Sequence, residues 1–577
     1  MGHHHHHGHG HDHGPDHGHE HTHEGASGPL PAAMDPEVPD AELSPDQLSR
    51  RSMLRRAGLL SAGVAGAGVL AGTGAAMATS PGNTRGGGGN GGGNGRLLWL
   101  AGDHHIHTQY SSDGQYRVID QVRNGARHGL DWMVITDHGG AQHSRIGVER
   151  VNPDIREARD AHEDTLVFQG LEWNIPAAEH GTVFVHPGSN EVDVLKQFET
   201  DYDGGVNNAS ANTPQNEALA IAGLDFLAGQ VRRRRVRDAL MLANHPARQG
   251  VDSPHEIRAW RDAQPRIAVG FEGAPGHQAA GIPTPHGPGS GRGFYTGSPG
   301  ANSFPGYPAE SYRTWGGFDW MTATVGGLWD SLLSEGKRWS ISANSDSHVN
   351  YADTSDRPED TDFEANGFHG DPVYRGSGLN LTAGDFWPGQ YSRTHVGAQG
   401  FSYAAVMEGI REGRIWVDHG GLISALDAQV RGGNRSAGLG GTLHVRRGTH
   451  VELTMEIALA NGPNWARFVP KLARVDVIRG VVTGAADDRD TFHAPETGVA
   501  TSFEVNKSTG SVTFTYRLGR VDRPTYVRLR GTDGNRSQPG LNGASVDPSG
   551  PALDVLGDAD PWLDLWFYSN PIWVLPE

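Results

Sequence analysis

Gly102-Asp103-His104-His105-Ile106-His107 is the stretch that decides both the fold and the chemistry of this chain. The apolar residues Leu97–Leu100 precede it, so the histidines stand at the end of a short buried strand. Residues i and i+2 of a strand face the same side, so His105 and His107 point together and can bind one metal ion. A single His-x-His pair occurs by chance, so the interpretation depends on what the other strand ends carry.

Imidazoles and carboxylates stand at the ends of the other apolar runs in the same way. The runs Val134–Thr136, Phe168–Leu171, Met241–Ala243 and Trp339–Ala343 each lead into such a side chain, and His180 precedes the run Gly181–Val185. Each residue alone is explained as a buried histidine or a capping aspartate. Nine of them at successive strand ends form a polar cluster that would stay unsatisfied without metal. The predicted ligands are His105, His107, Asp113, His138, Glu172, His180, His245, Asp346 and His348.

The segment from Leu97 to about Ala425 alternates short apolar runs with helical patterns. Val118–His128 and Trp329–Glu335, each followed by a glycine, are two predicted helices. Strands that alternate with helices indicate an α/β fold with a parallel sheet or barrel, and the carboxyl ends of barrel strands carry the chemistry. Two irregular stretches, 200–216 and Gly273–Pro308, interrupt the alternation, and we expect the second to cover the pocket as a lid.

The ordered motifs HHIHTQYSSDG, ITDH, GLEWN, EHGTVFV, NHP and SDSH resemble those of the PHP (polymerase and histidinol phosphatase) superfamily over roughly Leu97–Leu426. The resemblance implies a distorted (β/α)7 barrel with two or three divalent metal ions, held by the nine residues above. It also implies that the Glu172 carboxylate bridges two ions. Asp113 stands six residues after His107, whereas an offset of five is commoner in the family. The C-terminal segment DPWLDLWFYSNPIWV and an export signal are similar to the secreted branch of CehA/McbA-like metallohydrolases.

Metal ions at such a site would lower the pKa of a bridging water and clamp the attacking and leaving oxygens of an ester. The metal-bridging hydroxide is then the nucleophile, since the chain has no cysteine and no Gly-x-Ser-x-Gly motif. We therefore expect a phosphoesterase in which His105, Glu172 and Asp346 act at the metal centre and Arg248 pairs with the substrate phosphate. Nitrogen and oxygen ligands accept Zn, Mn or Fe alike.

Other charged residues have more than one explanation. Asp103 and Asp137 stand beside predicted ligand histidines, so each is a candidate for orienting an imidazole by accepting its second N–H. For Asp103 a contact in a strand-end turn is an equal alternative. The run Arg232–Arg235 is consistent with phosphate binding, but a solvated helix face explains it better.

Two alternative functions remain open. A carboxylester or carbamate hydrolase would use the same metals, because an activated water attacks a carbonyl as readily as a phosphoryl group. An aromatic lid made of Phe294, Tyr295, Trp315 and Trp320 would favour aryl esters. The third function is a non-catalytic metal-binding protein, which predicts missing ligands in the barrel, and none of the nine is missing.

The pattern changes after about residue 427. Val451–Ile457, Ala473–Arg479, Val512–Arg517 and Thr525–Arg530 alternate strictly, with turn residues between them. Such alternation predicts antiparallel strands with one buried face, so we expect residues 427–577 to form a small accessory β-sandwich. The apolar end of the chain should be a buried strand.

The first 95 residues carry signals for export rather than a fold. Residues 1–48 include 12 histidines between His3 and His23 and no segment able to form a core. Residues 49–78 hold the pair Arg50-Arg51, an apolar stretch and an Ala76-Met77-Ala78 cleavage site, which resemble a twin-arginine signal peptide. Residues 79–95 are a glycine-rich linker, so the catalytic barrel is predicted at 96–426.

The amino-acid composition limits the kinds of molecule that the protein can bind. The 577 residues include 67 acidic and 48 basic ones, a net charge of −19, which disfavours nucleic-acid binding. The absence of cysteine excludes disulfides and iron–sulfur clusters. The expected partners are a small-molecule ester and the twin-arginine export machinery, with no stable membrane span after cleavage.

Overall fold

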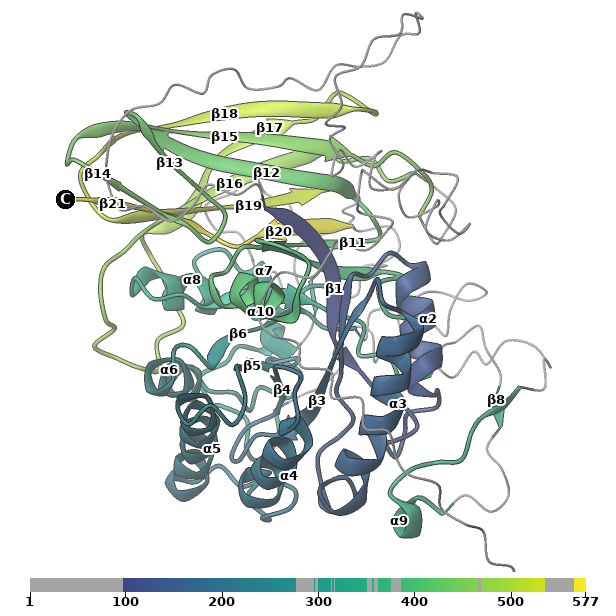
Figure 1. Ribbon diagram of the computed structural model, residues 1–577. Helices are drawn as coiled ribbons and strands as arrows, with labels where there is room; N and C mark the ends of the chain where they lie inside the picture. The colour runs from purple at the N-terminus through teal and green to yellow at the C-terminus, as the bar shows by residue number, and fades with distance from the viewer. Residues whose placement is uncertain are drawn as a thin grey trace, which may run out of the picture.

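The computed structural model describes residues 97–276, 295, 299–312, 314–315, 317–349, 355–356, 362–374, 385–464, 469–534 and 565–577. The histidine-rich segment, the signal peptide and the linker predicted at 1–95 lie outside these residues. Figure 1 shows a half covered by helices and a half built almost entirely of strands. Strand β1 runs from the strand-rich half into the helix-covered half and connects the two.

Seven strands in sequential order form the sheet of the helix-covered half. Helices α2 (Val118–Arg127) and α8 (Leu328–Ser334) confirm the two predicted helices. Gly129 and Gly336 stand two residues after them, with φ angles of 85° and 75° that suit glycine. The strands are β1 (Leu98–Ile106), β2 (Trp132–Ile135), β3 (Leu166–Asn174), β4 (His180–Val185), β5 (Ala239–Ala243), β6 (Ala268–Ala274) and β7 (Ser340–Ala343). The main helices are α2 (Val118–Arg127), α3 (Val148–Ala161), α4 (Glu191–Tyr202), α5 (Pro214–Arg232), α6 (Pro254–Ala263) and α8 (Leu328–Ser334).

The expected closed (β/α)7 barrel is not found among the described residues. The free side of β1 pairs with β10 (Ser392–Ala398), so the sheet continues instead of closing on β7. The sheet nevertheless curls, because Ile106 and Ser347 form an isolated parallel bridge. The Thr394 hydroxyl of β10 also bonds both the N–H and the carbonyl of Ala343 in β7, at 2.8 Å each.

The predicted parallel sheet is found on both sides of β4 but is interrupted at that strand. β4 runs antiparallel to both β3 and β5. Only residues 175–179 connect β3 to β4, which is too short for the crossover helix that a parallel pair needs. The Glu172 and His180 positions are thereby brought close together at the turn.

The strand-rich half consists of two facing sheets, as expected for a sandwich, but one of them continues the main sheet. β11 (Ile415–His419) pairs with β20 (Trp566–Ser569), and the order then runs β20-β19-β21-β14. The other sheet has the order β13-β12-β15-β18. The remaining strands are β12 (Ile423–Gly432), β13 (Arg435–Gly438), β14 (Thr442–Val445), β15 (Thr449–Leu459), β16 (Arg474–Val481), β17 (Thr497–Glu504), β18 (Ser511–Val521), β19 (Thr525–Thr532) and β21 (Ile572–Pro576).

A continuous apolar core lies between these two sheets. Leu453 of β15, Val477 of β16 and Phe567 of β20 are buried in it, so the alternation of β15 and β16 and the apolar chain end are explained. The predicted boundary at 427 stays a prediction, and β12 spans that position.

β19 departs from the expectation of one buried face, because both of its faces are buried. Arg528 lies against helix α8, where its guanidinium bonds both oxygens of Asp330 at 2.8 and 2.6 Å and lies 4.5 Å from the ring centre of Trp329. Arg530 bonds Asp476 of β16 at 2.9 Å. The polar positions of this strand are therefore neutralised by buried carboxylates instead of solvent.

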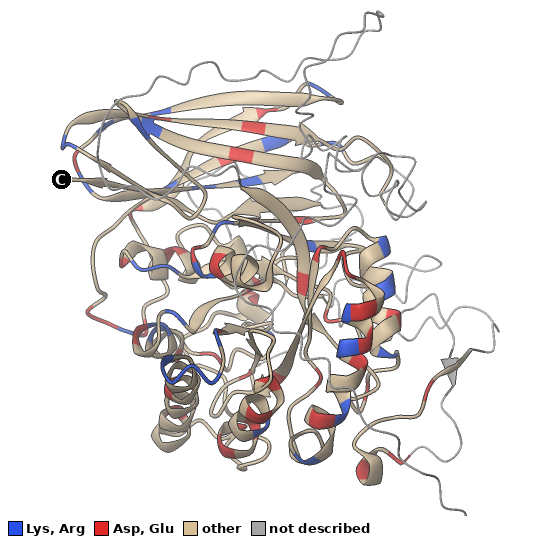
Figure 2. Cartoon of the chain, in the orientation of Figure 1, with Lys and Arg blue, Asp and Glu red and all other residues tan. Residues whose placement is uncertain are grey.

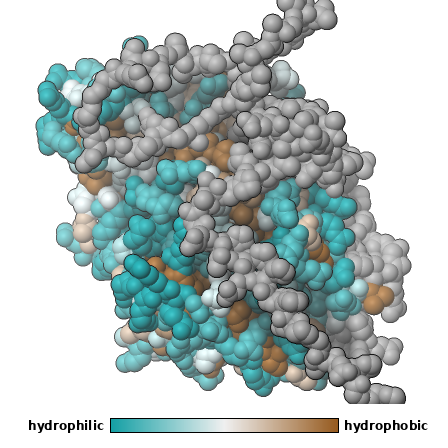
Figure 3. Space-filling view, in the orientation of Figure 1, coloured by the Kyte–Doolittle hydropathy of each residue, from teal (hydrophilic) through white to brown (hydrophobic). Residues whose placement is uncertain are grey.

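The outer surface of the described residues is mainly hydrophilic in the view of Figure 3, with apolar residues in small separate patches. Acidic and basic residues are interspersed along α2 and α3 in Figure 2, and Asp120 pairs with both Arg117 and Arg123. No helix within the described parts of the chain is long and apolar enough to cross a membrane.

We predict that Asp330→Asn lowers the free energy of unfolding by about 3 kcal/mol, because it leaves the Arg528 charge buried without its partner. Urea denaturation would measure the change. Lys196→Gln breaks an exposed pair with Glu149 and should cost less than about 1 kcal/mol. Equal effects of the two substitutions would contradict a buried ion pair between the halves.

Candidate metal centre

The Glu172 carboxylate at the end of β3 lies at the centre of a ring of imidazoles. All five contacting nitrogens come from other strand ends, as the sequence pattern predicts. The distances to Glu172 Oε1 are 3.0 Å from His105 Nε2, 3.1 Å from His180 Nδ1 and 3.1 Å from His245 Nε2; those to Oε2 are 2.7 Å from His138 Nδ1 and 3.4 Å from His107 Nε2.

The remaining predicted ligands complete the ring. Asp346 Oδ1, which follows β7, lies 3.1 Å from His105 Nε2 and 3.2 Å from His107 Nε2. Asp113 Oδ1 lies 3.3 Å from His138 Nε2 and 3.6 Å from His348 Nε2. The structure thus brings all nine predicted residues together, and Asp113 differs from the others in being mostly exposed.

The donor set fits divalent cations. The Nε2 atoms of His105 and His107 face each other at 3.0 Å. A single shared proton can join two such nitrogens, and a metal cation that accepts both lone pairs can take its place. Five overlapping groups of three residues place their ligand atoms within 4.8 Å of one another. These groups are His107/His138/His348, His105/His107/Glu172, His105/His245/Asp346, His138/Glu172/His180 and Glu179/His180/His245.

Burial and neighbouring charges set the protonation states of the cluster. Burial, together with nearby cationic groups, lowers the pKa of His107 and of His245 well below the usual value, so both are neutral. Neutral imidazole is the form that binds metals. Burial opposes ionisation of Glu172, but the surrounding imidazoles outweigh burial and hold its pKa well below normal. Burial also opposes charge on His138, yet the facing carboxylates raise its pKa to about 10.

Two of the cluster residues have unusual backbone conformations. His245 and Asp346 stand two and three residues after the ends of β5 and β7, and they have φ angles of 30° and 48°, in a region that favours glycine. Strain of this kind persists only where the surroundings enforce it, and it concentrates at functional sites. The turns that aim these two side chains into the cluster are therefore maintained at a cost in stability.

Glu272 is a site residue that the sequence analysis missed. Its Oε1 lies 2.7 Å from His105 Nδ1 and accepts a bond from Asn344 Nδ2, while Oε2 accepts the backbone N–H of His245. Glu272 therefore fixes the His105 ring and leaves Nε2 to face the other ligands. The available signal was the run RIAVGFEG, which ends in a carboxylate as the ligand strands do.

Asp103 and Asp137 do not orient imidazoles directly. Asp103 accepts the backbone N–H groups of His105 and Ser345, which agrees with the alternative of a strand-end contact. Asp137 accepts bonds from Thr108 and from the Ser111 hydroxyl. Ser111 in turn lies 2.9 Å from His107 Nδ1, so the Asp137 carboxylate acts on that ring only through a hydroxyl.

The loop that carries His138 is fixed from behind by helix α4 and its C-terminal turn. Glu199 accepts the Gly140 N–H at 2.9 Å and contacts His143 Nδ1 with both oxygens. Asn174 Nδ2 donates to the Gly139 carbonyl at 2.9 Å and to Asp203 Oδ1 at 3.1 Å. His143 begins a short π-helix, 143–147, a feature that is frequent at functional sites.

Arg248 lies beside the cluster but is not free of partners. Its Nη2 donates to Glu179 Oε2 at 3.1 Å, and its side chain is 29% exposed. The arginines of the run 232–235 are exposed around the end of α5, as the solvated alternative predicted.

The predicted aromatic lid is only partly within the described residues. Trp315 and Trp320 are buried in the core and cannot line a lid, so that expectation is wrong for them. Phe294 and most of Gly273–Pro308 lie outside the described residues. Tyr295 is buried.

We predict that Glu172→Gln lowers the metal content of the purified protein by at least one equivalent, because this carboxylate touches five of the six histidines of the cluster. Inductively coupled plasma mass spectrometry would measure the loss. Glu157→Gln, at an exposed position of α3, is the matched control and should bind as much metal as the unchanged protein. Unaltered metal content in Glu172→Gln would refute the assignment.

No curated protein sequence matches this chain. Among solved structures, the chain matches a two-domain protein from Bacteroides vulgatus ATCC 8482, described as containing a predicted PHP-like metal-dependent phosphoesterase. The sequence identity is 14% and the TM-score is 0.30, and the match covers 80% of this chain and 96% of that chain. Residues 103–242, which supply six of the nine clustered side chains, match the family model described as the PHP domain.

Proposed function

We propose that this protein is a metal-dependent hydrolase that acts on ester bonds, with phosphoesters as its substrates. The observation that carries the proposal is the convergence of six histidines and two further carboxylates around Glu172. All of these residues except Asp113 belong to groups whose ligand atoms lie within 4.8 Å, and Asp113 lies 3.3 Å from His138. The cluster opens toward solvent at His138, Asp113 and His180, which are the more exposed members, so a small substrate can reach it.

Divalent ions bound there would supply Lewis-acid polarisation of the ester and a lowered pKa for the attacking water. The protein's own contribution is to hold the ligands still. Glu272 fixes the His105 ring, and Ser111 fixes the His107 ring. Because the residues behind the ligands are themselves buried and hydrogen-bonded, little reorganisation is needed during the reaction.

Arg248 favours a phosphoester over a carboxylester. Its guanidinium lies within electrostatic range of Glu172 and Asp346. One of its nitrogens donates to Glu179, and the side chain is partly exposed. A planar guanidinium at the rim can pair with the non-bridging oxygens of a phosphate. Trp315 and Trp320, two of the four aromatic residues that would favour aryl carboxylesters, are buried in the core.

We predict that His105→Ala lowers kcat/KM by more than about 100-fold, because it removes a predicted metal ligand that contacts both Glu172 and Asp346. Hydrolysis of 4-nitrophenyl phosphate and bis(4-nitrophenyl) phosphate would be compared with that of 4-nitrophenyl acetate, and the phosphoesters should be hydrolysed faster. His444→Ala, at an exposed histidine of β14, is the matched control.

Each other outcome has a definite meaning. Faster hydrolysis of the acetate would support a carboxylester or carbamate hydrolase. A metal-loaded protein without activity on any substrate would support a non-catalytic metal-binding protein. Full activity of His105→Ala would reject the site.

We also propose that the chain is exported through the twin-arginine pathway and belongs near the secreted CehA/McbA-like branch. The support is the sequence around Arg50-Arg51, the apolar stretch after it and the Ala76-Met77-Ala78 site. The absence of cysteine agrees with a protein that needs no oxidising compartment to fold.

We predict that replacing Arg50-Arg51 by Lys-Lys stops export and leaves the full-length precursor in the cytoplasm. Cell fractionation followed by mass determination of the N-terminus would measure this. Changing Arg55 to Lys instead is the control and should leave export unchanged. Normal export of the Lys-Lys protein would exclude a twin-arginine signal.

A further inference from the structure

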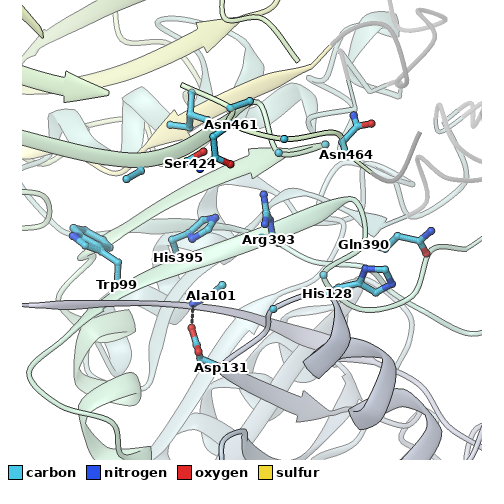
Figure 4. A pocket seen from close by; sticks show the side chains of 18 of the residues that line it. Trp99, Ala101, His128, Asp131, Gln390, Arg393, His395, Ser424, Asn461 and Asn464 are labelled. Carbon is cyan, nitrogen blue, oxygen red and sulfur yellow. Dashed lines mark hydrogen bonds between the residues drawn. The ribbon is translucent and has the colours of Figure 1, made fainter. Parts of the chain in front are cut away.

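A second cavity lies at the opposite end of β1 from the metal centre. It has a volume of about 360 Å³, within the range of small-molecule sites. One wall comes from Ala101 of β1 and the residues before β2, and the facing wall comes from β12 and the loop after β15. Figure 4 shows Arg393 and His395 of β10 between these walls, with His128 and Asp131 on one side and Ser424 and Asn461 on the other.

This cavity is separate from the metal centre. Trp99 lines the cavity and His105 is a metal-centre residue, and six residues of strand span about 20 Å. The two positions also leave the strand on different faces, because β1 contains one extra residue between Asp103, which pairs with Met133, and Ile106, which pairs with Ile135. No predicted metal ligand lines the cavity.

Two arginines, Arg127 and Arg393, and one carboxylate, Asp131, line the cavity, and the Asp131 Oδ2 accepts the Ala101 backbone N–H at 2.8 Å. Arg393 uses Nη2 to bond Asp418 at 3.1 Å, and no other acceptor among the described residues bonds its guanidinium. Asp418 does not line the cavity, whereas the exposed Arg127 does. Burial and the two arginines lower the pKa of His128 to about 4, so this histidine is neutral and leaves the positive charge on the arginines.

Flat and polar groups surround this charge. The His395 ring stacks on Trp416 at 3.6 Å with an angle of 3° between the rings, and Trp99 adds a half-buried indole. Asn461 and Ser424 supply amide and hydroxyl groups on the facing wall. Such a lining binds the face of a ring and the polar groups at its edge.

Glycines form part of the cavity walls. Gly421 has a φ angle of 69°, which other residues adopt only with strain, and a Cβ added there would lie 3.4 Å from the Arg393 guanidinium. At Gly462 an added Cβ would meet nothing within 4 Å, so this part of the wall faces open space. At these two glycines a ligand can approach the main chain closely.

We propose that this cavity binds a small organic anion that carries a carboxylate on a ring. The carboxylate pairs with the Arg393 guanidinium, whose planar N–H groups match it, and the ring lies against the aromatic residues. The ring has two possible sources, an aromatic acid or a sugar acid, because indole and imidazole faces accept both. The site is independent of the proposed hydrolase activity.

Isothermal titration calorimetry on the metal-loaded protein would test this with benzoate and with glucuronate as probes, and with benzamide and glucose as their uncharged counterparts. We expect one of the two acids to bind and its neutral counterpart to bind at least tenfold more weakly. Binding of benzoate alone identifies an aromatic acid, and binding of glucuronate alone identifies a sugar acid. Binding of neither acid overturns the proposal.

Variants would locate the binding. Arg393→Lys keeps the charge beside Asp418 but loses the planar fork, and it should weaken binding at least tenfold. Asn461→Ala, on the exposed loop and outside the ion pair, should weaken it severalfold even if Arg393→Lys does not fold. Arg266→Lys, at an exposed arginine of another surface, is the matched control and should bind normally.

One further comparison separates this site from the metal centre. The acid should bind to Glu172→Gln as it does to the unchanged protein. Binding that is lost in Glu172→Gln but kept in Arg393→Lys and Asn461→Ala would place the acid at the metal ions and overturn the proposal. Tighter binding of inorganic phosphate than of either acid would also overturn it, because a ring would then contribute nothing.

Discussion

The concentration of ligand groups around one buried carboxylate is the constraint on which the helix-covered half depends. Glu172 and four of its five imidazole neighbours come from the ends of different strands or from the turns after them, so the strands must bend until those ends meet. Removing so many polar groups from water is costly unless they bind cations or one another. The contacts of Glu272, Ser111 and Glu199 show that polar residues around the cluster hold its histidines in place.

The positions of most of the clustered residues could be predicted from the sequence because these residues follow short apolar runs. When such runs form neighbouring strands of one sheet, the ends of the strands lie close together. The closed barrel could not be predicted correctly, since the partner of β1 is β10, nearly 300 residues later, and no local pattern specifies such pairing. Glu272 stands in the same kind of position as the ligands, but a single carboxylate between Phe271 and Gly273 forms no recognisable motif. Asp103 and Asp137 show why the opposite error occurs. A carboxylate next to a histidine in the sequence can accept hydrogen bonds from other groups, so its position alone does not predict that it orients the imidazole.

Alternation of polar and apolar residues predicted the strands of the C-terminal half but not their environment. In β15 the polar positions face water, whereas in β19 the same pattern places Arg528 and Arg530 in buried ion pairs. The difference arises because helix α8 packs on the second face of β19 and supplies Asp330. Polar residues on one face of a strand therefore show that this face needs hydrogen-bond or ion-pair partners. Those partners can be water molecules or buried side chains of opposite charge.

The extra residue in β1 has a consequence for how this chain can vary. A perfectly regular strand would turn positions 99, 101, 105 and 107 to one side, so the arginine-lined cavity and the histidine cluster could not share it. A substitution near Asp103 alters single contacts. Deletion of one residue there would turn the side chains of half of the strand to the opposite face of the sheet. The length of this short segment is thus under stricter constraint than its composition, and both ends of the strand depend on it.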